Sequence, residues 1–304
     1  MKISHGIEYA AVRVLAGLFR TLPHRKAVAL GELLGRAADV VWTARHRVIL
    51  KNLDIAFGDS LSENQRRDLA REVFGNLGKT MAEVSRFPKI NRDLILGLVE
   101  SEGEDAFREA LDYGRGAILA GSHFGNWELS GAYVNALGYP VDFVVRGQHN
   151  PLVDRYLTYL RQCLNVRVIH SERGMREVIR ALRQNRQVAI VSDQHAGSGG
   201  ILVEFFGRLV SVPRAPATLA VRTGAPIITG CIYRRPDDRH YCVFQKPEYP
   251  RTDADEKEEI FRLTKLFTSR IEAVIRSRPD LWLWTHRRFK PVGGAKPTEG
   301  SYVE

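Results

Sequence analysis

The feature that most constrains the fold is a change of pattern near residue 90. Beyond it, short apolar runs rich in β-branched residues alternate with amphipathic runs of helical length. The expected strands are 117–120, 141–145, 166–169, 188–192, 227–233 and 241–245. The expected helices are roughly 103–113, 127–137, 151–163, 174–185, 214–223 and 255–277. Such alternation predicts an α/β fold, with a mostly parallel central sheet covered by helices on both faces.

The first 90 residues are expected to be almost entirely helical. Apolar residues recur at helical spacing over 7–21 and again over 26–44, with Pro23 between the two segments. A long third helix is expected after Ser60 or Ser62, either of which can cap it. We therefore divide the chain into an amphipathic helical segment (1–90), an α/β core (91–290) and a flexible tail (291–304).

Positive charge is concentrated at the start of the chain. The whole chain has a net charge of +10, and residues 1–51 hold nine Lys or Arg against three Asp or Glu. A basic amphipathic segment suits an anionic lipid surface or an acidic protein, and a solvated basic face is the alternative. Nucleic acid is not an expected partner, because no recognised binding motif accompanies the charge. Arg13 interrupts the early apolar stretch, so we expect no cleavable signal peptide and no membrane span.

The stretch GSHFGNWELSG, residues 121–131, carries the strongest chemical signal. It lies where an expected strand ends and an expected helix begins, which is where open α/β sheets bind ligands. His123 and Glu128 can meet only if the first lies in the turn and the second on the helix, with Gly125 allowing the turn and Asn126 capping the helix. His123 would then be a general base whose other ring N–H is held by Glu128. The alternative is a histidine that merely ends the strand, with Glu128 favouring the helix N-terminus.

Polar residues also follow two other expected strands and close the folded part of the chain. They are Arg146 and Asn150, then Asp193 and Gln194, then Arg287 and Arg288. Each alone could be a salt-bridge or turn residue, but together they indicate a substrate site. The three scattered cysteines, Cys163, Cys231 and Cys242, have the spacing of neither a zinc site nor a disulfide framework, and no metal site is expected.

Several motifs resemble those of the bacterial late acyltransferases of lipid A biosynthesis, the lauroyl or myristoyl acyltransferases. The resemblance runs almost end to end, through RHRVILKNLDIAFGD, HFGNWE, VVRGQHNPLVD, SDQHAGSGGILVEFFGR, APATLAVRTGAPII and WTHRRFK. It implies a glycerolipid acyltransferase-like fold and peripheral or monotopic attachment to the cytoplasmic face of the inner membrane. It also implies transfer of a fatty acyl group from acyl carrier protein, or from coenzyme A, to a glycolipid hydroxyl.

The resemblance assigns the catalytic pair to His123 and Glu128. Positions for activity or substrate binding fall on Arg146, Arg161 and Asp193, with Asn150, Gln194, Arg287 and Arg288 as further substrate-binding candidates. Asp193 is the alternative partner of His123.

In the chemistry implied, His123 removes the proton of the acceptor hydroxyl, and backbone N–H groups or Arg146 stabilise the carbonyl oxygen. No Ser or Cys lies in a nucleophile elbow, so no acyl-enzyme is expected, and no cofactor beyond the acyl thioester. The implied partners are acyl carrier protein, anionic membrane lipids and the glycolipid acceptor. A sister enzyme acting on another glycolipid, such as a phosphatidylinositol mannoside, and a non-catalytic lipid-binding protein are the alternatives.

Overall fold

The N-terminal part of the chain forms four helices. The computed structural model describes residues 3–171 and 174–291, so the predicted tail lies almost entirely outside the described residues. The helices are α1 (Ile3–Thr21), α2 (His24–Val41), α3 (Thr43–Phe57) and α4 (Glu63–Ser85). Ser62 caps α4 in a capping box with Gln65, as one of the two predicted caps. The second predicted helix (26–44) ends earlier than expected, because the helix breaks at Trp42 and α3 begins as a separate helix.

The core is a seven-stranded sheet with the order β1-β9-β8-β2-β5-β3-β4. Its strands are β1 (Val99–Glu102), β2 (Ala117–Gly121), β3 (Val141–Val145), β4 (Arg167–His170), β5 (Gln187–Val191), β8 (Ile227–Arg234) and β9 (His240–Phe244). All neighbours are parallel except the hairpin pair β8 and β9. The predicted α/β fold with a mostly parallel sheet is therefore confirmed.

The sequence did not predict three of the strands. One is the edge strand β1, and the others form a separate antiparallel ribbon of β6 (Ile201–Phe205) and β7 (Arg208–Val212). Short 3₁₀ turns lie at Gly58–Ser60, Phe87–Lys89, Gly197–Gly199 and Pro279–Leu281.

Helices cover both faces of the sheet, and each face has its own core. One face carries α5 (Arg92–Leu98), α6 (Asp105–Tyr113), α7 (Trp127–Ala136) and α8 (Pro151–Gln162), and the other carries α9 (Met175–Arg183), α10 (Ala215–Thr223) and α11 (Glu256–Ser277). Along β2 the side chains alternate, so Ala117 belongs to the first core and Ile118 to the second. None of the helices in the described ranges is long and apolar enough to cross a membrane.

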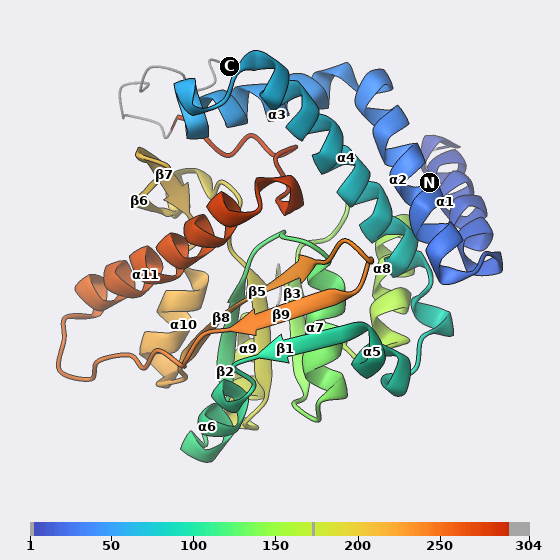
Figure 1. Ribbon diagram of the computed structural model, residues 1–304. Helices are drawn as coiled ribbons and strands as arrows, with labels where there is room; N and C mark the ends of the chain where they lie inside the picture. The colour runs from blue at the N-terminus through green and yellow to red at the C-terminus, as the bar shows by residue number, and fades with distance from the viewer. Residues whose placement is uncertain (1–2, 172–173, 292–304) are drawn as a thin grey trace.

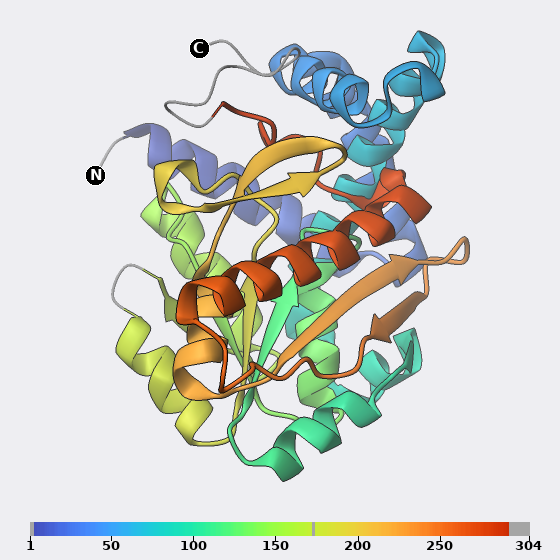
Figure 2. The same cartoon turned by 90° about the vertical axis from the view of Figure 1, so that its left-hand side faces the viewer.

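The N-terminal helices lie over the edge where β2, β3 and β5 end (Figures 1 and 2). Gly31 and Gly35 of α2 let the backbones of α2 and α4 approach, since a Cβ on Gly35 would lie 2.1 Å from the carbonyl oxygen of Phe74. The opposite face of α4 touches the turn after β2, where Thr80 Oγ1 donates to the carbonyl of Gly125 at 3.4 Å. This edge holds the candidate site.

Candidate active site

The turn between β2 and α7 has the geometry that the sequence predicted. Gly125 has a φ of +58°, and a Cβ there would lie 1.9 Å from the carbonyl oxygen of Ile232, so only glycine fits. Asn126 caps α7 by accepting a hydrogen bond from the backbone N–H of Leu129 at 3.1 Å. His123 therefore lies in the turn, and Glu128 lies in the first turn of the helix.

The ring of His123 is hydrogen-bonded to Asp193, which follows β5. The two atoms, His123 Nδ1 and Asp193 Oδ1, are 2.7 Å apart. Asp193 Oδ2 accepts from the backbone N–H of His123 and from the indole N–H of Trp282, each at 2.7 Å. Because an ionised carboxylate only accepts, Nδ1 carries a proton, and when the ring is neutral Nε2 has the lone pair. The expectation that Glu128 holds this N–H is therefore wrong, and the alternative partner, Asp193, takes its place.

Electrostatics favour a charged pair at this position. Burial alone lowers the pKa of His123, but the charge and hydrogen bond of Asp193, with a smaller contribution from Glu128, raise that pKa above its ordinary value. Burial alone raises the pKa of Asp193, but His123 and the indole of Trp282 hold it below its ordinary value. Asp193 is thus an anion that can stabilise an imidazolium formed by proton transfer.

Glu128 is instead paired with Arg161 of α8. Arg161 donates from Nε to Oε2 at 2.8 Å and from Nη2 to Oε1 at 2.6 Å. Burial lowers the pKa of Arg161, but Glu128 raises it by more, so the guanidinium stays charged. Two parallel hydrogen bonds fix the plane of the Glu128 carboxylate. Its charge affects His123 electrostatically, without a hydrogen bond between the two side chains.

A cavity of about 250 Å³ lies beside His123. Polar residues that line it are Ser122, His123, Glu128, Ser130, Arg146, Gln148 and Arg161. Apolar side chains from the sheet and from α7 line the rest, among them Leu119, Val134, Phe143, Ile190, Ile228 and Phe244. The site therefore joins a carboxylate-bound histidine and an ion pair to a space suited to an apolar ligand.

The other predicted substrate contacts are not all brought to the cavity. The cap of α8, Asn150, is buried and donates to the carbonyl of His5 and to Glu8, which ties α8 to α1. Arg288 is also buried, donating to the carbonyl of Ser211 at 2.7 Å with its guanidinium over the ring of Phe205. Gln194 is half-buried and Arg287 exposed, and neither lines the cavity. In place of direct contacts, Asn150 and Arg288 hold neighbouring segments together.

Trp282 is the residue that sequence reasoning missed. Its indole N–H lies buried against Asp193, and its backbone bridges to Phe124 beside His123. The available signal was the Trp-rich run LWLWTH, because a buried indole N–H needs an acceptor. His286 lies nearby and accepts from the backbone N–H of His195 at 3.3 Å. Burial lowers the pKa of His286 to about 4, so it is neutral near pH 7.

Comparisons with known proteins place the chain among acyltransferases. A profile of the bacterial lipid A biosynthesis acyltransferases matches residues 2–291. The lipid A biosynthesis palmitoleoyltransferase of Escherichia coli strain K12 is 28% identical over 280 residues, covering 91% of this chain and 89% of that protein. The phosphatidylinositol mannoside acyltransferase of Mycobacterium tuberculosis strain H37Rv is 31% identical over 218 residues, covering 67% of this chain and 65% of that protein.

A solved structure, the 1-acyl-sn-glycerophosphate acyltransferase of Thermotoga maritima, aligns with a TM-score of 0.39 and 17% identity. The alignment covers 84% of this chain and 99% of that chain.

Proposed function

Because the chain belongs to the bacterial lipid A biosynthesis acyltransferase family, we propose that it is an O-acyltransferase that acylates a hydroxyl of a lipid A-type glycolipid precursor. The acyl group would come from a thioester of acyl carrier protein or coenzyme A. The observation that carries the proposal is the place of His123, hydrogen-bonded to a buried carboxylate and open to a largely apolar cavity.

In the proposed reaction the fatty acyl chain occupies the apolar part of the cavity, and the thioester carbonyl lies next to His123. Nε2 of His123 accepts the proton of the acceptor hydroxyl, while the hydroxyl oxygen forms a bond to the thioester carbonyl carbon. The C–S bond then breaks, and the leaving thiolate takes the proton back from the imidazolium. Asp193 stabilises the imidazolium in between. Negative charge develops on the oxygen of the thioester carbonyl and needs hydrogen-bond donors to stabilise it. Backbone N–H groups of the turn or Arg146 at the cavity are the candidates.

Two features support attachment of this enzyme to the surface of a membrane, which we place at the cytoplasmic face of the inner membrane. Ten exposed large apolar side chains lie on the first two helices and their junction with α3: Ile3, Ile7, Val14, Leu15, Leu18, Leu33, Leu34, Val40, Val41 and Trp42. Arg45 and Arg47, both exposed, follow directly. Apolar side chains with flanking arginines suit the interface of an anionic bilayer, where Trp is also favoured.

The partners follow from the same surfaces. Acyl carrier protein is acidic, so exposed cations near the cavity, Arg146 among them, would receive it. The phosphates of a lipid A precursor would also be attracted to this region. No cofactor is needed beyond the acyl thioester, which is a co-substrate.

A second candidate acceptor is a phosphatidylinositol mannoside, favoured by the relative from Mycobacterium tuberculosis that is 31% identical. The test is acyl transfer from radiolabelled acyl carrier protein or acyl coenzyme A, with wild type beside His123→Ala. Each reaction contains either a tetraacylated lipid A precursor or a phosphatidylinositol mannoside, in detergent micelles. We expect labelling of the lipid A precursor by wild type alone. Labelling of the mannoside alone would reassign the acceptor, and labelling of neither lipid would contradict the proposed function.

A further inference from the structure

The buried carboxylate of Glu83, on α4, binds Asn126, the cap of α7. Neither residue is one of the reacting groups described above. Glu83 is 2% exposed and Asn126 is fully buried. The side-chain amide of Asn126 donates to Glu83 Oε2 at 2.8 Å, while its oxygen accepts from Leu129. One side chain therefore both caps α7 and joins it to the N-terminal helices.

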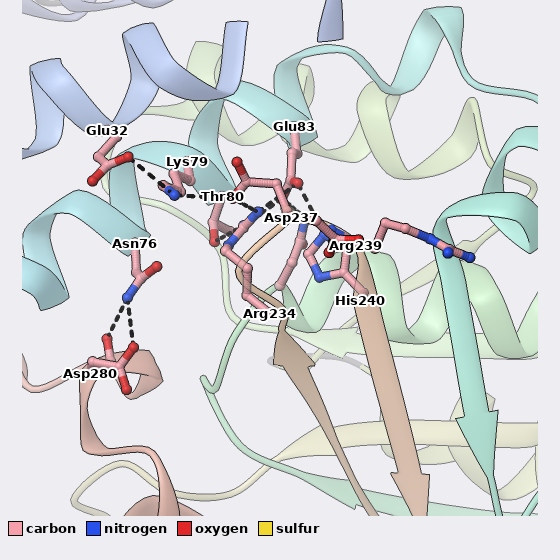
Figure 3. A network of polar contacts seen from close by, with 12 residues as sticks. Glu32, Asn76, Lys79, Thr80, Glu83, Arg234, Asp237, Arg239, His240 and Asp280 are labelled. Atoms are coloured by element: carbon pink, nitrogen blue, oxygen red, sulfur yellow. Dashed lines mark hydrogen bonds and ion pairs between the residues drawn. The ribbon is translucent and has the colours of Figure 1, made fainter. Parts of the chain in front are cut away.

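Two residues from the hairpin of β8 and β9 fix Glu83 in place (Figure 3). Arg234 donates to Oε1 at 2.8 Å and to Oε2 at 2.6 Å, and His240 Nε2 lies 3.0 Å from Oε1. Burial alone raises the pKa of Glu83, but Arg234 and His240 lower it by more, so the carboxylate is ionised. An ionised group with this many partners in a closed site has one favourable position.

Because of the position of Asn126, this network can affect where His123 and Glu128 lie. Asn126 lies between His123 and Glu128, so any displacement of the cap moves one or both. Asn126 has no exposed surface, so it does not touch a substrate and can act only through its neighbours. Thr80, on the same helix as Glu83, reinforces the link by donating to the carbonyl of Gly125.

We propose that Glu83 and Asn126 are a pair of positioning residues that sets His123 relative to the cavity, and so couples the N-terminal helices to the rate of acyl transfer. The kinetic part of this inference rests on the proposed function. A misplacement of about 1 Å at a reacting group can cost on the order of 10² in rate, so the pair need not touch substrate to matter.

The first test is Asn126→Ser, which keeps a good cap and removes the donor to Glu83. We expect kcat to fall about 10- to 100-fold with KM changed less than about threefold, because the base is displaced while the cavity is intact. The matched control is Asn91→Ser, at the exposed cap of α5, where Asn91 accepts from Leu94 at 2.9 Å. A kcat of Asn126→Ser within twofold of the control would overturn the proposal.

The second test reverses the pair. Within the pair, Glu83→Gln removes the carboxylate and Asn126→Asp adds a second one, whereas the double variant restores one carboxylate facing one amide donor. Asp caps a helix as well as Asn, so the cap survives in the double variant. We expect the double variant to recover at least tenfold in kcat over each single variant. If a single variant does not fold, folding of the double variant is itself the rescue, and a double variant no better than the singles overturns the proposal.

The third test does not depend on activity. In protein labelled with ¹⁵N-histidine, the ring signals of His123, assigned with His123→Ala, should shift in Asn126→Ser and stay unchanged in Asn91→Ser. If wild type transfers no acyl group, the proposed function fails, while this shift still supports the positioning pair. Unchanged His123 signals in Asn126→Ser would overturn the pair even if the enzyme is active.

Discussion

Arg161 holds Glu128 through two parallel hydrogen bonds, and so the acidic residue of the H-x4-E motif faces an arginine instead of the histidine. The distances are 2.8 Å and 2.6 Å, and the two side chains are only 13% and 10% exposed. The motif therefore brings two different pairs to the cavity, His123 with Asp193 and Glu128 with Arg161. Each pair has a distinct experimental signature.

The pair of Glu128 and Arg161 should contribute to stability. Arg161→Met leaves a mostly buried carboxylate without its cation, and we expect a loss of about 3 kcal/mol in the free energy of unfolding. Urea-induced unfolding followed by circular dichroism measures it. Arg222→Met is the control, since Arg222 pairs with Glu256 on the surface at 3.1 Å and both are largely exposed. Equal losses in the two variants would contradict the structural role of Arg161.

The two carboxylates should differ in their effect on the rate. Asp193→Asn removes the anion that sets the tautomer of His123, and we expect kcat to fall by on the order of 10³ to 10⁴. Glu128→Gln removes only the electrostatic effect of Glu128 on His123 and the ion pair with Arg161, and we expect kcat to fall by about 10². Steady-state rates of acyl transfer measured with both variants show which substitution lowers kcat more. A larger loss in Glu128→Gln than in Asp193→Asn would show that the ring depends on Glu128 after all.

The raised pKa of His123 predicts opposite effects of pH on rate and stability. A general base must be neutral, so kcat/KM should rise with pH through a midpoint above about 6.5. Protonation is favoured in the folded state, so the stabilisation from His123 is complete below about pH 6.5 and is lost as the pH rises through the folded-state pKa.

Both effects can be measured between pH 5.5 and 9, with initial rates and with urea unfolding. In His123→Ala, the free energy of unfolding should decrease less as the pH rises than it does in wild type. A wild-type rate that falls as the pH rises across this range would exclude His123 as the base.

The cavity should limit the length of the acyl chain. Val134→Phe adds bulk to a buried residue of the lining, and we expect the ratio of kcat/KM values to move toward shorter donors. One methylene in an apolar pocket is worth about 10- to 200-fold in such a ratio. Val178→Phe is the matched control, because Val178 is buried in the core of the other face. It should lower stability through overpacking without changing the preferred chain length.

The exposed apolar residues of the N-terminal helices should bind anionic vesicles. Trp42 is 53% exposed, Trp127 is half-buried in the cavity lining, and Trp282 and Trp284 are buried. The part of a vesicle-induced blue shift that is lost in Trp42→Phe therefore reports Trp42. Val41→Asp should weaken binding in a sedimentation assay, since it adds a charge to a side chain that is 83% exposed. Leu209→Asp, on β7, is the control, and equal weakening by both would show that these helices are not the binding face.

The sequence predicted the parts of the fold that depend on local pattern. The turn at Gly125, the cap at Asn126 and six strands follow from residue type and periodicity, and all are present. Strand β1 was missed because its sequence, VESE, lacks apolar alternation, and its place is fixed by pairing with β9. The break at Trp42 was missed because apolar spacing continues across it.

The site was predicted less completely, because its geometry depends on segments far apart in the sequence. The spacing of His123 and Glu128 allowed a contact and the family resemblance assigned it, but Asp193, 70 residues from His123, is the residue hydrogen-bonded to the ring nitrogen. Arg288 was read as a cation for substrate, yet it is buried against Phe205 and Ser211. Charge and spacing identify candidates, and only packing decides which of them reach the cavity.

The residues that close the site come from the end of the chain. Trp282 reaches Asp193, and the backbone N–H of Leu283 donates to the carbonyl of His123 at 3.0 Å. On the ribosome, the helices that carry the exposed apolar side chains are synthesised long before Trp282 and Leu283. A nascent chain that ends before residue 282 has His123 and Asp193 but lacks the segment that contacts both of them. The contacts that complete the arrangement of His123 and Asp193 therefore form only late in synthesis, well after the N-terminal helices have been made.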